Sequence, residues 1–163
     1  MPSPVLLPID FVLARHNISW RELLVGLDRG WVQPRDALTL AHRRRAIGDD
    51  SPELDALLEL GPSDRVMPHV MALAALEPEQ DPREMIARWG ELALAWTWHY
   101  REALGDPLAT VADLWSDFDF PPSWEPFIHY LAAADDDADA AATRARALDR
   151  WERFVASHVP PTT

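Results

Sequence analysis

The stretch Asp81–Gly105, DPREMIARWGELALAWTWHYREALG, decides the predicted fold. Asp81 is a good helix N-cap and Pro82 suits the first helical position, while Glu84 is placed to complete a reciprocal capping box. At the other end, Gly105 is the residue type that favours a left-handed C-cap. The whole stretch is therefore predicted to form one long helix.

Apolar residues cover most of the surface of this predicted helix. At about 100° per residue, one stripe contains Met85, Trp89, Leu92, Trp96 and Tyr100. A helix that is apolar over most of its circumference is usually covered by neighbours on several sides. We therefore expect this helix to form the centre of the core, with Trp89 and Trp96 nearly inaccessible to solvent, rather than a cradle for a ligand.

Other parts of the chain repeat such start and stop patterns. Ser19 to Glu22 reads as a capping box, and Gly30 closes the helix that follows. Further helices are expected at residues 34–47, 53–60, 64–76, 107–116, 124–131 and 138–159. Residues 1–18 fit either a short helix or an extended arm. Since no stretch alternates as a strand would, the sequence predicts an all-α, single-domain compact bundle of about seven helices over residues 1–163.

Composition sets outer limits on the class of protein. The chain has 163 residues and 48% hydrophobic content, which is enough for one globular domain with a core. It contains no cysteine, so disulfides and thiolate metal sites are excluded. There is no basic leader segment and no apolar run long enough for a bilayer. We expect a cytoplasmic protein without a membrane partner.

The net charge of −12 arises from 27 acidic residues against 15 basic ones, all of which are arginine. This balance argues against nucleic acid as a partner, because such binding depends on basic side chains. It is compatible with a basic protein partner, or with charge that only maintains solubility. The basic cluster Arg43–Arg45 fits either a contact with phosphate or nucleic acid, or the favourable placement of cations at a helix C-terminus. We favour the second interpretation.

An acidic and aromatic segment follows the predicted helix 107–116. In Asp117-Phe118-Asp119-Phe120, we expect both aromatic rings to pin the turn to the core, while the carboxylates accept backbone amides. Residues 132–139 are predicted to be a flexible acidic loop, and 160–163 a frayed tail. Exposed acids of these segments are the candidate partner-binding residues: Asp117, Asp119, Glu125, Asp135, Asp136, Asp137 and Asp139.

Carboxylates of the same region also raise the question of a metal site. A hard cation takes several oxygen ligands, and the candidates are Asp113, Asp117, Asp119, Glu125 and His129. Their spacing does not match a calcium-binding loop, and no histidines have helical zinc spacing. There is also no phosphate loop and no nucleophile elbow. We therefore predict no catalytic, cofactor or metal residue, and no cofactor; a metal-dependent enzyme is the third interpretation.

Two stretches resemble a known family. These are ISWRELLVGLDRGW at residues 18–31 and WSDFDFP at 115–121, with the tryptophan-rich helix between them. Together they resemble an uncharacterised bacterial family of domains of unknown function, whose motif has a tyrosine where this chain has Phe120. The resemblance covers most of the chain and implies no catalytic residues. Some small acidic proteins of this kind lie beside polymorphic toxins and serve as immunity proteins.

These observations lead to two main functional hypotheses. The first is a non-enzymatic protein-binding module of the immunity type, which neutralises a cognate and basic toxin domain. The alternative is a structural or regulatory helical domain that forms a homodimer, for which an exposed tryptophan patch around Trp98 or Trp124 would argue. The sequence leaves monomer and homodimer open.

Overall fold

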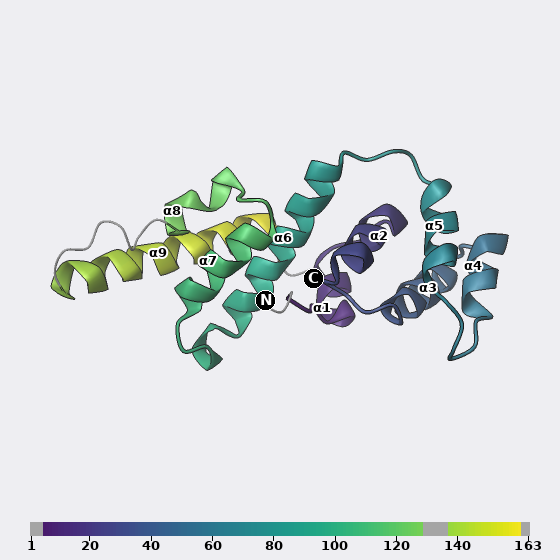
Figure 1. Ribbon diagram of the computed structural model, residues 1–163, viewed down its shortest axis with the longest axis horizontal. Helices are drawn as coiled ribbons and strands as arrows, with labels where there is room; N and C mark the ends of the chain where they lie inside the picture. Colours follow the sequence, from purple (N-terminus) through teal and green to yellow (C-terminus); the bar gives the residue numbers. More distant parts are fainter. Residues whose placement is uncertain (1–4, 129–136, 161–163) are drawn as a thin grey trace. The chain divides into compact units, whose positions relative to one another are not determined.

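The computed structural model describes residues 5–128 and 137–160, with side chains of the last helix from Ala140 onward. Within these residues the regular structure is entirely helical and contains no strand (Figure 1). The predicted all-α class is confirmed. Contacts between backbone positions divide the chain into two compact units, residues 4–85 and 86–163. Whether the two units unfold together as one domain stays a prediction.

The N-terminal unit contains five complete helices (Figure 1). They are α1 (Ile9–Arg15), α2 (Trp20–Arg29), α3 (Asp36–Ala46), α4 (Pro52–Leu58) and α5 (Met67–Ala75). Helix α5 packs against α2 and α4, while α3 packs against α4 and α1. The alternative that the sequence left open for the N-terminal segment is thus settled in favour of a short helix.

Helix α2 begins and ends as its sequence predicts. The hydroxyl of Ser19 accepts the backbone N–H of Glu22, and the Glu22 carboxylate accepts the backbone N–H of Ser19. Gly30 closes the helix with φ 78°, in the left-handed region that favours glycine. The chain then turns back, because Trp31 donates its backbone N–H to the carbonyl of Gly26 at 2.8 Å. Trp31 is buried as a result.

The basic cluster at the end of α3 has structural roles. Arg44 donates from Nη2 to the carbonyl oxygen of Ile18 at 2.6 Å. Arg45 forms an ion pair with Asp55 of α4. Arg43 is exposed. All three arginines lie in the last turn of α3, as the favoured interpretation expects, and two of them also connect α3 to neighbouring segments.

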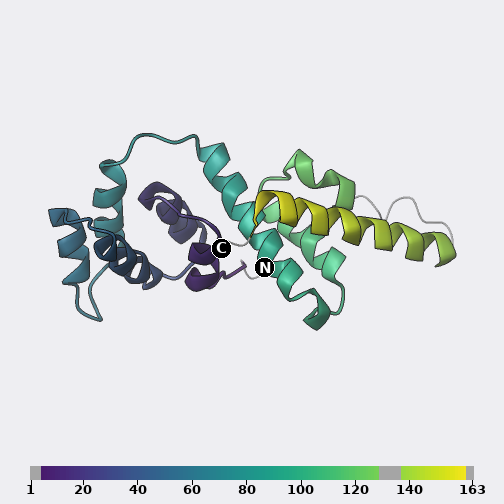
Figure 2. The same ribbon diagram turned by 180° about the vertical axis from the view of Figure 1, so that it is seen from behind.

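The C-terminal unit is built from the remaining helices. They are α6 (Pro82–His99), whose first turn belongs to the N-terminal unit, η1 (Arg101–Ala103), α7 (Pro107–Asp117), η2 (Pro122–Trp124), α8 (Glu125–Ile128) and α9 (Asp137–His158). Helix α8 packs against both α7 and α9, and it lies alongside α9 in both views (Figure 1, Figure 2). Of the predicted acidic loop 132–139, the first five residues lie outside the described part, and 137–139 form the start of α9.

Helix α6 begins where predicted but ends earlier. Asp81 accepts the backbone N–H of Arg83 at 2.9 Å, as an N-cap does. The helix stops at His99 and is followed by the short 3₁₀ turn η1. The predicted left-handed C-cap at Gly105 is wrong, since Gly105 has no positive φ. The reason is that Arg101 donates from Nη1 to the carbonyl of Trp98 at 2.9 Å, which satisfies a carbonyl at the helix end without a glycine.

The middle of α6 is the core of the C-terminal unit. Trp89 has no exposed surface, as expected. Trp96 is partly exposed, so its predicted inaccessibility is wrong; it packs edge-on against Tyr100, which is itself 45% exposed. From α9, the fully buried Trp151 donates its indole N–H to the carbonyl of Leu94 at 3.2 Å. Helix α6 therefore receives a tryptophan from a distant helix, as the sequence predicts.

A second tryptophan packs on α6 through a glycine. A Cβ atom added at Gly90 would lie 3.0 Å from Cζ2 of Trp124 and 3.3 Å from Cδ1 of Phe118. The missing side chain lets both rings approach the helix backbone, and both are buried, each at 2% exposure. Trp124 consequently cannot form the exposed tryptophan patch that would have favoured a homodimer.

Candidate partner-binding site

The segment after α7 has an unusual backbone. Helix α7 ends at Asp117, and Phe118 donates its backbone N–H to the carbonyls of Leu114 and Ser116. The next two residues, Asp119 and Phe120, have φ of 62° and 55°. Left-handed backbone at a residue with a side chain costs about 1–3 kcal/mol and is concentrated at functional sites. Two consecutive examples therefore make this turn a candidate site.

Three contacts of the same turn hold the backbone in this state. Phe120 donates its backbone N–H to the carbonyl of Trp115 at 2.9 Å. In return, Trp115 donates its indole N–H to the carbonyl of Pro121 at 3.0 Å. The rings of Trp115 and Phe120 also meet edge to face, with 5.1 Å between centroids, a favourable aromatic geometry. These contacts within the turn thus offset the cost of the left-handed backbone.

The two phenylalanines of the turn have opposite environments. Phe118 is 2% exposed and faces the core beside Gly90, as expected. Phe120 is 56% exposed, so the prediction that it pins the turn to the core is wrong. The left-handed φ values of Asp119 and Phe120 explain the difference, because they reverse the chain direction directly after Phe118. The turn therefore presents an aromatic ring at the surface.

Acidic side chains accompany this ring. Asp113 and Asp119 are exposed, and Asp117 is partly buried. Burial raises the pKa of the Asp117 carboxyl above its ordinary value, and the negative charge of Asp113, four residues earlier on α7, raises it further. The effect of Asp113 indicates that these two carboxylates are neighbours. A cation brought to this turn would relieve their repulsion.

The structure says less about the other predicted partner-binding residues. Glu125 is exposed at the first position of α8. Asp135 and Asp136 lie outside the described residues. Asp137 and Asp139 belong to the first turn of α9, but their side chains also lie outside the described part. Of the predicted residues, Asp117 and Asp119 thus lie together at the end of α7. The structure adds two residues to the candidate site: Asp113 on α7 and the exposed Phe120.

The carboxylates of this turn do not form a metal centre in the part of the chain that the structure describes. No group of three or more His, Cys, Asp or Glu side chains is arranged there to hold a metal ion. His129, which completed the candidate ligand set, lies outside the described residues. The metal-dependent enzyme therefore stays an untested interpretation.

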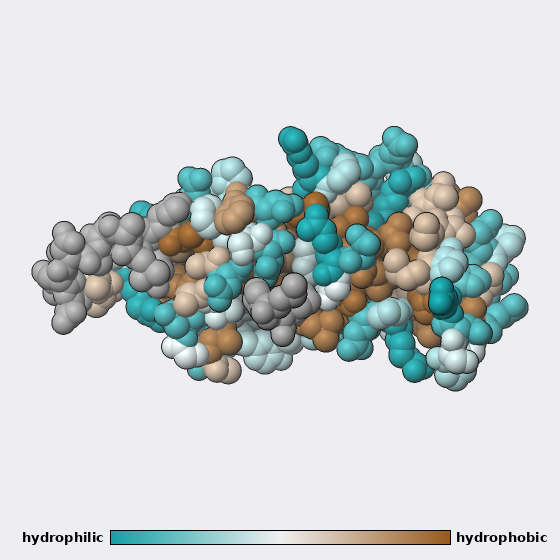
Figure 3. Space-filling model, viewed as in Figure 1, coloured by the Kyte–Doolittle hydropathy of each residue, from teal (hydrophilic) through white to brown (hydrophobic). Residues whose placement is uncertain are grey.

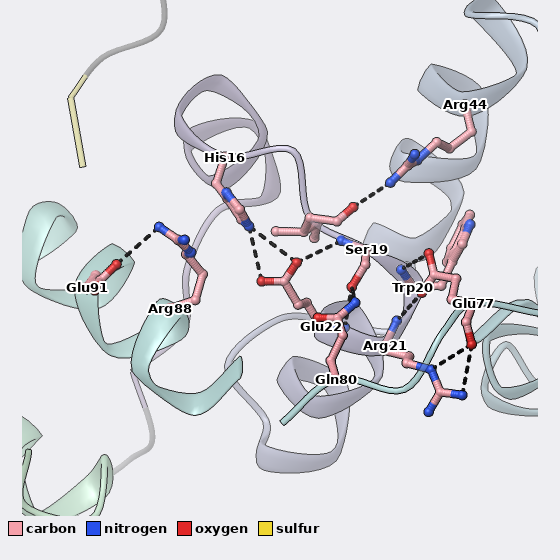
Figure 4. Close-up of polar contacts among 11 residues, drawn as sticks. His16, Ser19, Trp20, Arg21, Glu22, Arg44, Glu77, Gln80, Arg88 and Glu91 are labelled. Atoms are coloured by element: carbon pink, nitrogen blue, oxygen red, sulfur yellow. Dashed lines mark hydrogen bonds and ion pairs between the residues drawn. The ribbon is translucent and has the colours of Figure 1, made fainter. Parts of the chain in front are cut away.

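Sequence reasoning missed a polar network at the start of α2 (Figure 4). The carboxylate of Glu77 accepts the backbone N–H groups of Trp20 and Arg21, at 3.1 and 2.9 Å. Arg21 reciprocates by donating from Nε and Nη2 to the carbonyl of Glu77, at 3.2 and 3.1 Å. A negative charge at this helix end is favourable. Nothing near Glu77 in the sequence points to α2, because 57 residues separate Glu77 from Trp20.

Neighbouring side chains extend this network (Figure 4). Nε2 of His16 lies 3.1 Å from one oxygen of the Glu22 carboxylate and 3.3 Å from the other. Gln80 donates from Nε2 to the hydroxyl of Ser19 at 2.9 Å. Burial alone would raise the pKa of Glu22, but the hydrogen bonds from His16 and Ser19 and the charge of His16 hold it below the ordinary value. These contacts fix the start of α2.

Fold and candidate site together define an all-helical protein that presents an acidic turn with an exposed aromatic ring. Residues 9–158 match the family model described as an uncharacterized protein conserved in bacteria (DUF2247), and the chain belongs to this family. The resemblance noted at residues 18–31 and 115–121 is thereby confirmed. No curated protein and no solved structure matches the chain. Among the described residues, none of the helices combines the length and apolar character needed to cross a bilayer.

Proposed function

We propose that this protein is a non-enzymatic binding module of the immunity type, which captures a basic toxin domain through the turn Ser116–Pro121. The observation that supports it best is the exposure of Phe120, 56%, on a backbone that holds two left-handed residues. An exposed apolar ring on a strained backbone costs free energy, which burial of the ring in a partner would offset. The proposal places the protein in the cytoplasm.

The chemistry around Phe120 suits a protein partner. Binding energy at interfaces is concentrated in a few residues, often aromatic, within a rim that excludes water. Here Asp113, Asp117 and Asp119 all lie within seven residues before Phe120 in the sequence, in a chain with a net charge of −12. Complementary charge speeds encounter with a basic partner and disfavours acidic ones. We therefore propose that lysine and arginine side chains of the partner flank an apolar recess that receives Phe120.

Co-expression tests this function. The probe is the toxin-like C-terminal domain encoded by a reading frame next to this gene, expressed from an inducible promoter in a host that it inhibits. Wild-type protein should restore growth. The variant Phe120→Ser should lose protection, because removal of a central aromatic anchor costs about 2 kcal/mol or more of binding, roughly a thirtyfold weaker Kd.

Leu76→Ser is the matched control for this experiment. Leu76 is also a large exposed apolar residue, at 61% exposure, but it belongs to the end of α5 in the N-terminal unit. The control should protect as well as the wild type does. Failure of the wild type to restore growth would refute the immunity role, and full protection by Phe120→Ser would refute the site.

A structural or regulatory homodimer is the second candidate. The observation in its favour is the exposure of Ile47 and Leu76, 76% and 61%, at the ends of α3 and α5. Single exposed apolar residues are common on monomers, so a dimer requires that they belong to a larger buried area. Light scattering over a range of concentrations distinguishes the two: a dimer mass supports this candidate, and a monomer mass throughout rejects it.

A further inference from the structure

A cavity of about 470 Å³ lies in the N-terminal unit, among the start of α3, the connection from α4 to α5, and the first turns of α5. Its volume is within the range of small-molecule sites, about 300–1,000 Å³. Its lining includes the apolar residues Leu38, Leu60, Met67 and Met71 and the charged residues Arg35, Asp64 and Arg65. The candidate partner-binding turn belongs to the other unit and shares none of these residues.

Most of this lining is apolar. Leu38, Leu60 and Met67 are only partly covered by the protein, and Met71 is 56% exposed. Figure 3 shows apolar residues gathered at the surface over α5. When a ligand covers exposed apolar surface in a concave site, binding is favoured by roughly 25 cal/mol for each Å² removed from water. The cavity therefore suits the hydrocarbon part of a ligand.

Two arginines give the cavity a charge opposite to that of the chain as a whole. Arg35 and Arg65 are exposed, and neither guanidinium forms an ion pair or hydrogen bond within the described part of the chain. The single acid in the lining, Asp64, already accepts the backbone N–H of Gly61 at 2.7 Å. The lining thus has one excess positive charge in a protein of net charge −12. This is the complement of an anionic group.

Backbone dipoles add to this positive field. Arg35 is the N-cap residue of α3, and Val66 is the N-cap residue of α5. Both helices therefore direct their N-terminal ends, where the helix dipole is positive, toward the residues that line the cavity. The effect of each helix dipole is modest at exposed positions. Together with the two free guanidinium groups, it favours a carboxylate over a neutral polar group.

We propose that this cavity binds a small amphiphilic carboxylate of the medium-chain fatty-acid class. The hydrocarbon chain lies against Leu38, Leu60 and the two methionines, and the carboxylate lies at the rim between Arg35 and Arg65. A single small molecule fits better than a membrane surface, because the site is a concave cavity rather than a projecting apolar face. The proposal is independent of the protein-binding function.

Methionine methyl groups provide a direct test with octanoate as the probe. Of the four methionines in the chain, Met67 and Met71 line the cavity, while Met85 is 8% exposed and does not. In ¹³C-methyl methionine NMR of the full chain, octanoate should shift the Met67 and Met71 signals saturably, with Kd on the order of 1 mM. The Met85 signal should stay in place. Octanamide, the uncharged counterpart, should bind more weakly, and acetate should give no shift.

The double variant Arg35→Gln/Arg65→Gln tests the role of charge. Both residues are exposed, so the fold should tolerate the change. Each exposed ion pair contributes little in water, so loss of both guanidinium groups should weaken octanoate binding by roughly two- to thirtyfold. Octanamide binding should stay unchanged. Arg43→Gln is the matched control, because Arg43 is exposed on α3 but outside the lining; it should change neither Kd.

Two results would overturn the proposal. If octanoate does not shift the Met67 and Met71 signals, or shifts the Met85 signal equally, the cavity is not a binding site. Equal affinity for octanoate and octanamide, with no effect of the double variant, would show that the site does not select an anion. Neither result bears on the growth test at Phe120, so the two proposals fail separately.

Discussion

The carboxylate of Glu77 accepts the backbone N–H of Trp20 at 3.1 Å, although 57 residues separate them in the chain. The first turn of α2 therefore has two caps. One is the local capping box of Ser19 and Glu22, and the other comes from the segment that leads into α6. The second cap connects the start of α2 to the segment after α5.

Replacing Glu77 by alanine should destabilise the protein. The change removes two backbone hydrogen bonds to a charged acceptor, and loss of a helix cap costs about 0.5–2 kcal/mol. We expect a decrease of about 1–2 kcal/mol in the free energy of unfolding, measured by urea denaturation. Glu79→Ala is the matched control, since Glu79 is an exposed acid two residues away, and should have little effect. Equal effects of both variants would contradict the proposed cap.

Gly90→Ala should also destabilise the protein, against the usual trend for glycine in a helix. An alanine gains about 0.5–1 kcal/mol from helix propensity, but its Cβ would lie 3.0 Å from Trp124. The Trp124 ring is packed against Phe118 and Phe127, so it has little room to move. Overpacking of this kind costs about 1–3 kcal/mol, and we expect a net loss of about 1 kcal/mol.

Gly105→Ala provides the comparison for this substitution. Apart from Gly105 itself and its two chain neighbours, no atom of the described residues lies within 4 Å of a Cβ placed at Gly105, and its φ is not positive. This variant should be neutral or slightly stabilising, because alanine restricts the unfolded chain more than glycine does. Thermal unfolding of the two variants side by side checks the prediction. A gain in stability from Gly90→Ala would show that the ring of Trp124 moves aside easily.

Stability should depend on pH through Glu22. Its pKa is lowered by His16 and Ser19 from an ordinary value of 4.5, in spite of burial. A lowered folded-state pKa means that the carboxylate stabilises the folded state above about pH 4.5, and that this contribution is lost as pH falls through the folded-state pKa. The stability difference between wild type and Glu22→Gln should be largest at neutral pH and shrink below pH 4.5. Urea unfolding from pH 7 to pH 3 measures it; a constant difference would contradict the prediction.

Asp117→Asn should stabilise the free protein while weakening partner binding. Burial and the charge of Asp113 raise the pKa of Asp117, so its ionised form is disfavoured in the folded state. The unfavourable effect applies when the pH lies above the unfolded-state value of 3.8 and disappears below it. The variant should therefore unfold at a higher temperature than wild type at pH 7, with no such gain at pH 3, and should give less growth protection. Lower stability at pH 7 would refute the stated electrostatic cause.

The sequence predicts those features that depend on near neighbours in the chain. The capping box of Ser19 and Glu22 and the left-handed Gly30 follow from residue types within one short stretch of chain, and they occur as predicted. The burial of Trp89 follows from helical periodicity. Features that depend on distant segments were missed. Glu77 caps a helix that begins 57 residues earlier in the chain. The cavity of the N-terminal unit is formed by three separate segments. No local sequence pattern therefore points to the Glu77 cap or to the cavity.

Two errors have local causes that residue type alone does not reveal. Gly105 was assigned as a helix cap, but the side chain of Arg101 satisfies the end of α6 six residues earlier. Phe120 was assigned to the core because it alternates with acids, yet the left-handed backbone exposes its ring. The first outcome depends on a side-chain hydrogen bond and the second on backbone dihedral angles, and neither can be read from residue type. Because of the second error, the sequence does not identify Phe120 as a residue of the candidate site.

The hydrogen bond from Trp151 to Leu94 makes one indole proton a reporter of how α9 stays attached to α6. Trp151 has no exposed surface and its N–H is engaged at 3.2 Å, so deuterium from solvent can replace this proton only when α9 moves away from α6. The exchange rate of that single indole signal therefore measures how often the two helices separate, in the intact protein and without denaturant. If a bound partner at the turn tightens the unit, this signal should exchange more slowly.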